Sequence, residues 1–259
     1  MAKTKKKDIL KGFIDGKSHY TMEGKDIIKN SSAPDPKRLA NDPEYAEVRV
    51  NNKLFGSTST LASSFRKALP DDFKVAMNNR IHGSLTSMFR SIVDDKREVL
   101  NLRLCKDTLF SFPFRKNYFF DSLAQFIPYE FQYAKDRSKI TFTLLPFKRT
   151  RSKKGPNCTH FRMTLGILPF ADCMRSEGVD SVQYNPVANP WHAKIMIGES
   201  TYVHNYMLER KEKITVSIPD EARHEQVSLV IFLHLAFYEE VNGKMYSQGS
   251  DVMKVADVI

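Results

Sequence analysis

The sequence is short of the residues from which phosphate-binding loops and catalytic elbows are built. Its 259 residues include only 11 glycines, and these form no G-x-x-x-x-G-K-[ST], G-x-G-x-x-G or G-x-S-x-G pattern. No H-E-x-x-H helix is present either. These absences favour a non-catalytic protein without a cofactor.

Cysteine is scarce as well. Cys105, Cys158 and Cys173 are an odd number, lie far apart and show no C-x-x-C spacing. This argues against a disulfide framework and against structural zinc. We therefore expect reduced thiols in a cytoplasmic protein without a metal site.

Long apolar runs are also missing. The longest apolar-rich run, VSLVIFLHLAF at 227–237, is shorter than the roughly 18 residues that a membrane-spanning helix needs, and it contains His234. No apolar core of a signal peptide follows the N-terminal lysines. We expect no membrane partner.

The positive charge that is present is concentrated in two short segments. The formal net charge is +10, and residues 1–7 carry four lysines while residues 148–154 carry five lysines and arginines, with no acidic residue in either segment. The rest of the chain is nearly neutral. Such a layout attracts an anionic partner locally and leaves most of the surface without a positive field.

The N-terminal residues 1–53 are predicted to form a flexible basic leader. They contain Pro34, Pro36 and Pro43 close together, and prolines at this density resist both helix and central strand.

Residues 54–128 are predicted to hold a helical pair followed by an aromatic connector. The first helix should begin at an N-cap at Ser57 and end before Pro70. The second should begin at Asp71, because apolar residues recur at three- and four-residue spacing from there to Ile92.

From 129 to 259 the period of the apolar residues changes to two. Alternation runs through KITFTLLPF, HFRMTLGIL, HAKIMIG and KITVSIP, as expected of strands with one face on a core. VSLVIFLHLAFY is apolar on both faces apart from His234, which is typical of a central strand. With EFQY and SDVMKVADV we count about seven strands, which predicts an antiparallel β-sandwich. The predicted fold class is α+β, with the helical pair packed on the sandwich.

The C-terminal sequence AFYEEVNGKMYSQGSDVMKVADVI resembles the end of a group of uncharacterised bacterial proteins that finish on a similar F-Y-x-E-V-N-G strand–turn–strand. In this chain the motif begins at Phe237 and ends at Gly243. The resemblance covers only the end of the chain and implies no function.

The first candidate site consists of the basic residues of the two charged segments. They are Lys5, Lys6, Lys7, Lys148, Arg149, Arg151, Lys153 and Lys154. The later segment lies between two alternating runs, so we expect it in the loop of a β-hairpin. A basic arm of this kind would contact phosphates of DNA or RNA without sequence preference, and a solvated hairpin tip is the alternative. The N-terminal lysines allow the same two interpretations.

The second candidate site is an aromatic interface in the connector. The stretch FSFPFRKNYFFDSLAQFIPYEFQY at 110–133 holds ten Phe and Tyr residues. The interface is expected to involve Phe112, Phe114, Tyr118, Phe119 and Phe120. Such clusters more often form a core or a protein interface than a platform for stacking bases.

The remaining polar residues are best explained by packing. Cys158, His160 and Cys173, even with a further histidine, match no zinc spacing. His234 is predicted to be a buried imidazole bonded to a neighbour. The adjacent Glu239 and Glu240 would point to opposite faces of a strand.

These observations predict a cytoplasmic, non-catalytic binding or assembly protein that acts through a β-sandwich and an aromatic-rich interface. Its partner would be another protein or a second copy of the chain. The alternative is a sequence-nonspecific nucleic-acid-binding protein that uses the basic tail and the basic arm.

Overall fold

The computed structural model describes residues 12–15, 17–22, 25–30, 35–93, 98–115, 120–124, 127–148, 158–178 and 181–259. The chain divides into two compact units, Met1–Arg49 and Val50–Ile259. The division falls within the long helix α2 (Ala46–Ala68).

The first unit contains a small antiparallel sheet and a helical corner. The sheet has the order β1-β2-β3. Its strands are β1 (Gly12–Ile14), β2 (Lys17–Met22) and β3 (Lys25–Asn30). The corner consists of α1 (Pro36–Asn41), the 3-10 helix η1 (Pro43–Tyr45) and the start of α2.

Two of the prolines that we expected to resist helix instead begin one. Pro36 occupies the first turn of α1 and Pro43 the first turn of η1, each after an aspartate that caps the helix. The Asp35 carboxylate accepts a hydrogen bond from the backbone N–H of Lys37 at 2.9 Å. Proline is favoured at this position because the first N–H groups of a helix have no intrahelical partner.

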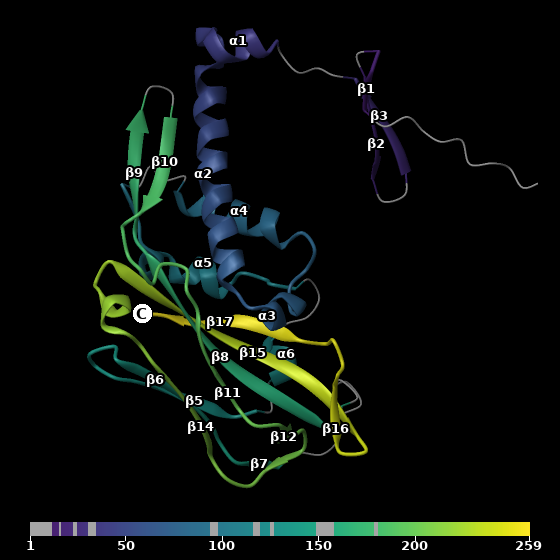
Figure 1. Ribbon diagram of the computed structural model, residues 1–259, viewed down its shortest axis with the longest axis vertical. Coiled ribbons are helices and arrows are strands. Elements are labelled where there is room, and N and C mark those ends of the chain that lie inside the picture. The colour runs from purple at the N-terminus through teal and green to yellow at the C-terminus, as the bar shows by residue number, and fades with distance from the viewer. Residues whose placement is uncertain are drawn as a thin grey trace, which may run out of the picture. The chain divides into compact units, whose positions relative to one another are not determined.

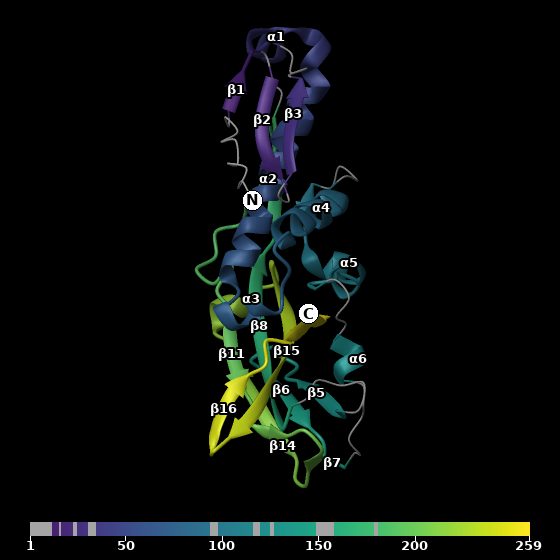
Figure 2. The same cartoon turned by 90° about the vertical axis from the view of Figure 1, so that its right-hand side faces the viewer.

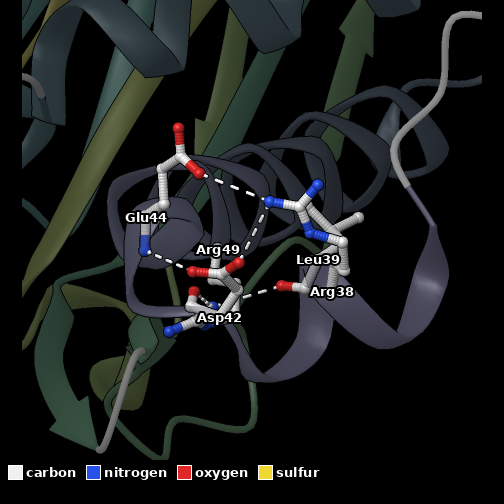
Figure 3. Close-up of polar contacts among 5 residues, drawn as sticks. All are labelled: Arg38, Leu39, Asp42, Glu44 and Arg49. Atoms are coloured by element: carbon white, nitrogen blue, oxygen red, sulfur yellow. Dashed lines mark hydrogen bonds and ion pairs between the residues drawn. The ribbon is translucent and has the colours of Figure 1, made fainter.

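The corner is held by two arginines (Figure 3). The guanidinium of Arg49 donates to the carbonyl oxygens of Leu39 at 3.2 Å and Asp42 at 2.8 Å. Arg38 forms ion pairs with Asp42 at 3.2 Å and Glu44 at 3.5 Å. These contacts fix the turn between α1 and α2.

The second unit contains the helices that pack on its sheets. They are the rest of α2, α3 (Asp71–Val75), α4 (Ile81–Val93), η2 (Leu102–Cys105), α5 (Lys106–Phe110), α6 (Phe120–Ala124) and η3 (Asp220–Arg223). In the described part of the chain, no helix is both long and apolar enough to cross a membrane.

The predicted helical pair is present, but its boundaries differ. Ser57 lies inside α2 and is not an N-cap; its hydroxyl accepts a hydrogen bond from the backbone N–H of Tyr184 at 2.8 Å. The second predicted helix is interrupted between α3 and α4. The helical hydrogen-bond pattern is broken at Asn78. Its N–H donates to the Phe114 carbonyl at 3.2 Å, and its side chain accepts a hydrogen bond from the Arg80 N–H at 2.8 Å.

The strands of the second unit are antiparallel throughout the described pairings. They are β4 (Val99–Leu100), β5 (Tyr129–Tyr133), β6 (Lys139–Leu144), β7 (Phe147–Lys148), β8 (His160–Ala171), β9 (Cys173–Gly178), β10 (Ser181–Pro186), β11 (Met196–Glu199), β12 (Val203–His204), β13 (Met207–Leu208), β14 (Glu212–Ser217), β15 (Val227–Val241), β16 (Lys244–Ser247) and β17 (Val252–Val258). Each of the seven predicted runs contains a strand, which confirms a mixed α and antiparallel β chain. The count of seven is not confirmed, because several short strands and the β9–β10 hairpin add to it.

The largest sheet, which we call the central sheet, has the order β11-β8-β15-β16, with β12 also paired to β8 and β17 to β15. A second sheet has the order β14-β6-β5, and two smaller ones pair β10-β9-β4 and β13-β7. The prediction that VSLVIFLHLAFY forms a central strand is confirmed, since β15 lies between β8 and β17.

The central sheet lies between the helices and the β14-β6-β5 sheet (Figures 1 and 2), and its strands β8 and β15 are buried along most of their length. On one face, Phe232 of β15 packs with Phe65 of α2, their ring centroids 5.8 Å apart, in a core that also includes α4 and α5. On the other face, Leu233 belongs to a core shared with Phe142 of β6. This is why β15 needs apolar residues at successive positions.

Candidate functional site

The candidate site lies where the apolar cover of the central sheet ends. Every residue of β15 from Val227 to Phe237 is buried, but Tyr238 is partly exposed and Glu240 is exposed. Paired residues of neighbouring strands share a face, and β8 pairs His160 with Tyr238. The even-numbered residues of β15 share the face of Phe232, so this polar end lies on the helix-bearing face of the sheet.

We call this group the sheet-end cluster. It comprises Asp72, His160, Arg162, Glu199, Tyr202, His204, Tyr238 and Glu240. Its members come from α3, β8, β11, β12, β15 and the β11–β12 loop. The cluster therefore joins segments that are far apart in the sequence.

Arg162 is the centre of the cluster. Its guanidinium lies 3.1 Å from the Glu199 carboxylate and 3.5 Å from the Asp72 carboxylate. It also lies 5.6 Å and 5.7 Å from the ring centroids of Tyr202 and Tyr238. The two rings contact each other edge to face at 4.8 Å. Two carboxylates and two aromatic rings thus hold one cation in place.

His160 extends the cluster toward the end of β15. Its Nδ1 lies 3.0 Å from the Thr159 hydroxyl and 3.8 Å from the Glu240 carboxylate. Its ring contacts the ring of His204 edge to face at 5.3 Å. The Thr159 hydroxyl also accepts a hydrogen bond from the Glu240 N–H at 2.7 Å, which ties this end of β15 to the start of β8.

Burial keeps the Tyr238 phenol neutral. Burial raises the pKa of the Tyr238 phenol, and the neighbouring Arg162 opposes this rise only in part. A neutral phenol can donate a hydrogen bond to a ligand, and its ring offers an aromatic surface for contact.

A buried ionisable pair lies beside the cluster on the same face. The prediction that His234 is buried is confirmed, and its ring stacks on Phe73 with centroids 4.8 Å apart. Its Nε2 lies 3.5 Å from the Asp251 carboxylate, but neither ring nitrogen forms a hydrogen bond in the described part of the chain. The predicted bond to a neighbour is therefore only an ion-pair contact.

The basic segment is not the loop of a hairpin between its flanking strands. β6 pairs with β5 and β14, whereas β8 pairs with β11, β12 and β15, so the two flanking strands belong to different sheets. Lys148 ends β7 and is exposed. The other predicted nucleic-acid contacts lie outside the described residues. They are Lys5, Lys6, Lys7, Arg149, Arg151, Lys153 and Lys154.

The described members of the predicted aromatic interface lie in or against the two cores. Phe114 is buried in the core that contains Phe232, Phe112 packs against the same core, and Phe120 is buried in the core on the opposite face. Tyr118 and Phe119 lie outside the described residues. The rings of Phe114 and Phe120 are therefore not accessible to a partner. Exposed aromatic side chains of the described chain include Phe110 of the connector, at 40%, and Tyr202, at 42%.

The cysteines are buried thiols. The amide of Asn205 donates to the sulfur of Cys158 at 3.2 Å. Burial, with a smaller effect of Asp172, raises the pKa of Cys173 to about 12, which keeps this thiol protonated and unreactive. Among the described residues, no group of three His, Cys, Asp or Glu side chains could hold a metal ion.

Sequence reasoning missed the sheet-end cluster because it is assembled by strand register. Arg162 looked like an ordinary outward-facing residue of a strand, and Tyr238 belonged to a run that is apolar on both faces apart from His234. The available signal was the pair of patterns His160-x-Arg162 and Tyr238-x-Glu240, which place polar and aromatic residues on one face of two strands. Only the pairing of β8 with β15 shows that these faces meet. Comparison with protein-family models and with curated proteins finds no match to this chain.

Proposed function

We propose that this chain is a non-catalytic binding protein that presents the sheet-end cluster to a partner protein. The observation that carries the proposal is the position of Arg162 against the contacting rings of Tyr202 and Tyr238, with its two terminal nitrogens near the carboxylates of Glu199 and Asp72. Tyrosine and arginine are enriched at the energetic centres of protein interfaces. Tyr202 is 42% exposed, so it can contact a partner without rearrangement.

A β-sandwich formed by the central sheet and the β14-β6-β5 sheet would supply the rigid support. The core that contains both Leu233 and Phe142 supports this arrangement. An arginine already held by four neighbours loses little side-chain entropy on binding. The aromatic interface expected from the sequence is therefore assigned to the cluster in place of the connector.

The charge of the cluster favours a basic partner segment. The carboxylates of Asp72, Glu199 and Glu240 are each more than one third exposed, and Arg162 is the only arginine or lysine in the cluster. A partner lysine or arginine could pair with these carboxylates and stack on the exposed ring of Tyr202.

Two matched tyrosine variants test the proposal. Tyr202→Ala removes the exposed ring of the cluster, and Tyr246→Ala removes a ring that is 51% exposed on β16. Tyr246 pairs with Glu239 and so lies on the opposite face of the sheet. We would measure self-association by light scattering, and binding of lysine- and arginine-rich model peptides by fluorescence anisotropy.

We expect Tyr202→Ala to weaken the association at least about tenfold, as for a residue at an interface centre, and Tyr246→Ala to leave it unchanged. A wild-type chain that stays monomeric and binds none of the peptides would contradict the proposal. Equal losses in the two variants would also contradict it.

A further inference from the structure

A pocket on the helical side of the second unit has a different chemistry from the sheet-end cluster. It lies between the end of α2, α3 and the start of α4 and has a volume of about 410 Å³. Its polar lining consists of Arg66, Lys74, Asn78, Asn79 and His82. A volume of this size accommodates a small molecule or one terminal group of a larger ligand.

The lining is cationic and has spare donors. None of the described lining residues is acidic, and Arg66 forms no ion pair or side-chain hydrogen bond within the described part of the chain. Lys74 pairs with Asp71 at 2.8 Å, but the Asp71 side chain is 95% exposed. Exposed pairs of this kind exchange readily with solvent and ions, so Lys74 can turn to a ligand.

The walls of the pocket are fixed by contacts outside it. Asn78 is held by the carbonyl of Phe114 and by the N–H of Arg80. The Nε2 of His82 lies 3.1 Å from the Ser59 hydroxyl, which ties the start of α4 to α2. The pocket also lies at the positive, N-terminal end of the α4 dipole, because Ile81 and His82 line it.

From this arrangement we propose that the pocket binds a phosphate group. Arginine offers a planar pair of donors that matches phosphate oxygens, lysine adds a mobile charge, and the amide of Asn79 adds a neutral donor. The group could belong to a small phosphorylated molecule or to a nucleic-acid backbone, and the chemistry of recognition is the same for both. This site is separate from the proposed protein interface and does not depend on it.

Titration calorimetry at low salt would measure binding of inorganic phosphate, pyrophosphate and a short single-stranded oligonucleotide to the full chain. The variants are Arg66→Gln and Lys74→Gln, with Lys67→Gln as the control. Lys67 is the next residue of α2, is also exposed and does not line the pocket. All three changes remove one surface charge, so they alter the net charge equally and should leave the fold intact.

We expect saturable binding of at least one probe, weakened about tenfold or more by Arg66→Gln and unchanged by Lys67→Gln. Binding of pyrophosphate would identify a small phosphorylated ligand, whereas binding of the oligonucleotide alone, with the same variant pattern, would identify a nucleic-acid backbone. Equal weakening by Arg66→Gln and Lys67→Gln would show only general charge attraction and overturn the proposal. The absence of binding of all three probes to the wild-type chain would overturn it as well.

Discussion

His192 shows how one partly buried side chain supports the end of β8. Its Nδ1 accepts a hydrogen bond from the backbone N–H of Ala171 at 3.1 Å, and its ring centroid lies 4.6 Å from that of Phe170. A protonated Nδ1 could not accept this bond. Burial lowers the pKa of His192, in agreement with the geometry.

This geometry predicts a loss of stability in mild acid. The pKa of His192 is lower in the folded than in the unfolded chain, so as the pH falls below about 6.5 the unfolded chain binds the proton first. The free energy of unfolding should therefore decrease with falling pH. Because the imidazole is partly exposed, solvent screening keeps its contribution well below the limit of about 1.4 kcal/mol per pH unit. His192→Asn keeps an acceptor for the Ala171 N–H but does not titrate.

Urea denaturation of wild type and His192→Asn between pH 7.5 and 5 would measure the effect, because the other histidines are common to both proteins. We expect the two stabilities to diverge as the pH falls, with the wild type losing more. Parallel curves would show that His192 does not titrate differently on folding.

The sequence predicted individual residues well where burial alone decides their environment. His234 was expected to be buried from its place in an apolar run, and it is. Arg162 was not recognised, because its neighbours Asp72 and Tyr238 come from distant segments. Nothing local in the sequence specifies which strands pair or in what register.

At the scale of elements, the strands were easier to predict than the helix boundaries. A period of two appears within a few residues, and each predicted run contains a strand. The N-cap of α2 was predicted at Ser57, although the helix begins at Ala46. Serine is a preferred N-cap residue, but the Ser57 hydroxyl accepts a hydrogen bond from the N–H of Tyr184. Pro36 and Pro43 did not prevent helix formation, because each lies in the first turn of its helix, where proline is favoured.

The contact between β11 and β14 gives a sharp test of sheet packing. A Cβ atom added at Gly198 of β11 would lie 2.6 Å from Cγ2 of Ile214 and 3.0 Å from Cγ2 of Val216. Both distances are shorter than a normal contact, so Gly198→Ala should lower the free energy of unfolding by about 1–3 kcal/mol through overpacking.

Gly56→Ala is the matched control. Gly56 lies in α2 with open space around the added Cβ, so alanine there should raise the stability by roughly 0.5–1 kcal/mol through helix propensity. Urea denaturation of both variants would show the opposite signs. A Gly198→Ala variant as stable as the wild type would contradict the prediction, because it would mean that β11 and β14 can move apart with little loss of free energy.

At the scale of the whole molecule, the helices and the strands of the second unit share a core. Phe65 of α2 and Phe89 of α4 pack with Phe170 of β8 and Phe232 of β15. The apolar stripes of the helices thus pack against one of the two apolar faces of β15, and together they form one core. Each was visible in the sequence, and their complementarity explains why helical pair and sheet form one compact unit.

The distribution of core residues predicts how the chain responds to truncation. No residue before Leu54 belongs to, or packs against, either core cluster of the described chain. Deleting residues 1–34 retains Asp35, the cap of α1, and should leave the stability of the second unit within about 0.5 kcal/mol of the wild type.

Deleting residues 252–259 removes β17, which supplies Val255 and Val258 to the core and pairs with β15, and should prevent stable folding. Thermal unfolding followed by near-ultraviolet circular dichroism would compare the two truncations. A large destabilisation by the N-terminal deletion would mean that residues outside both core clusters stabilise the second unit, and would contradict this prediction.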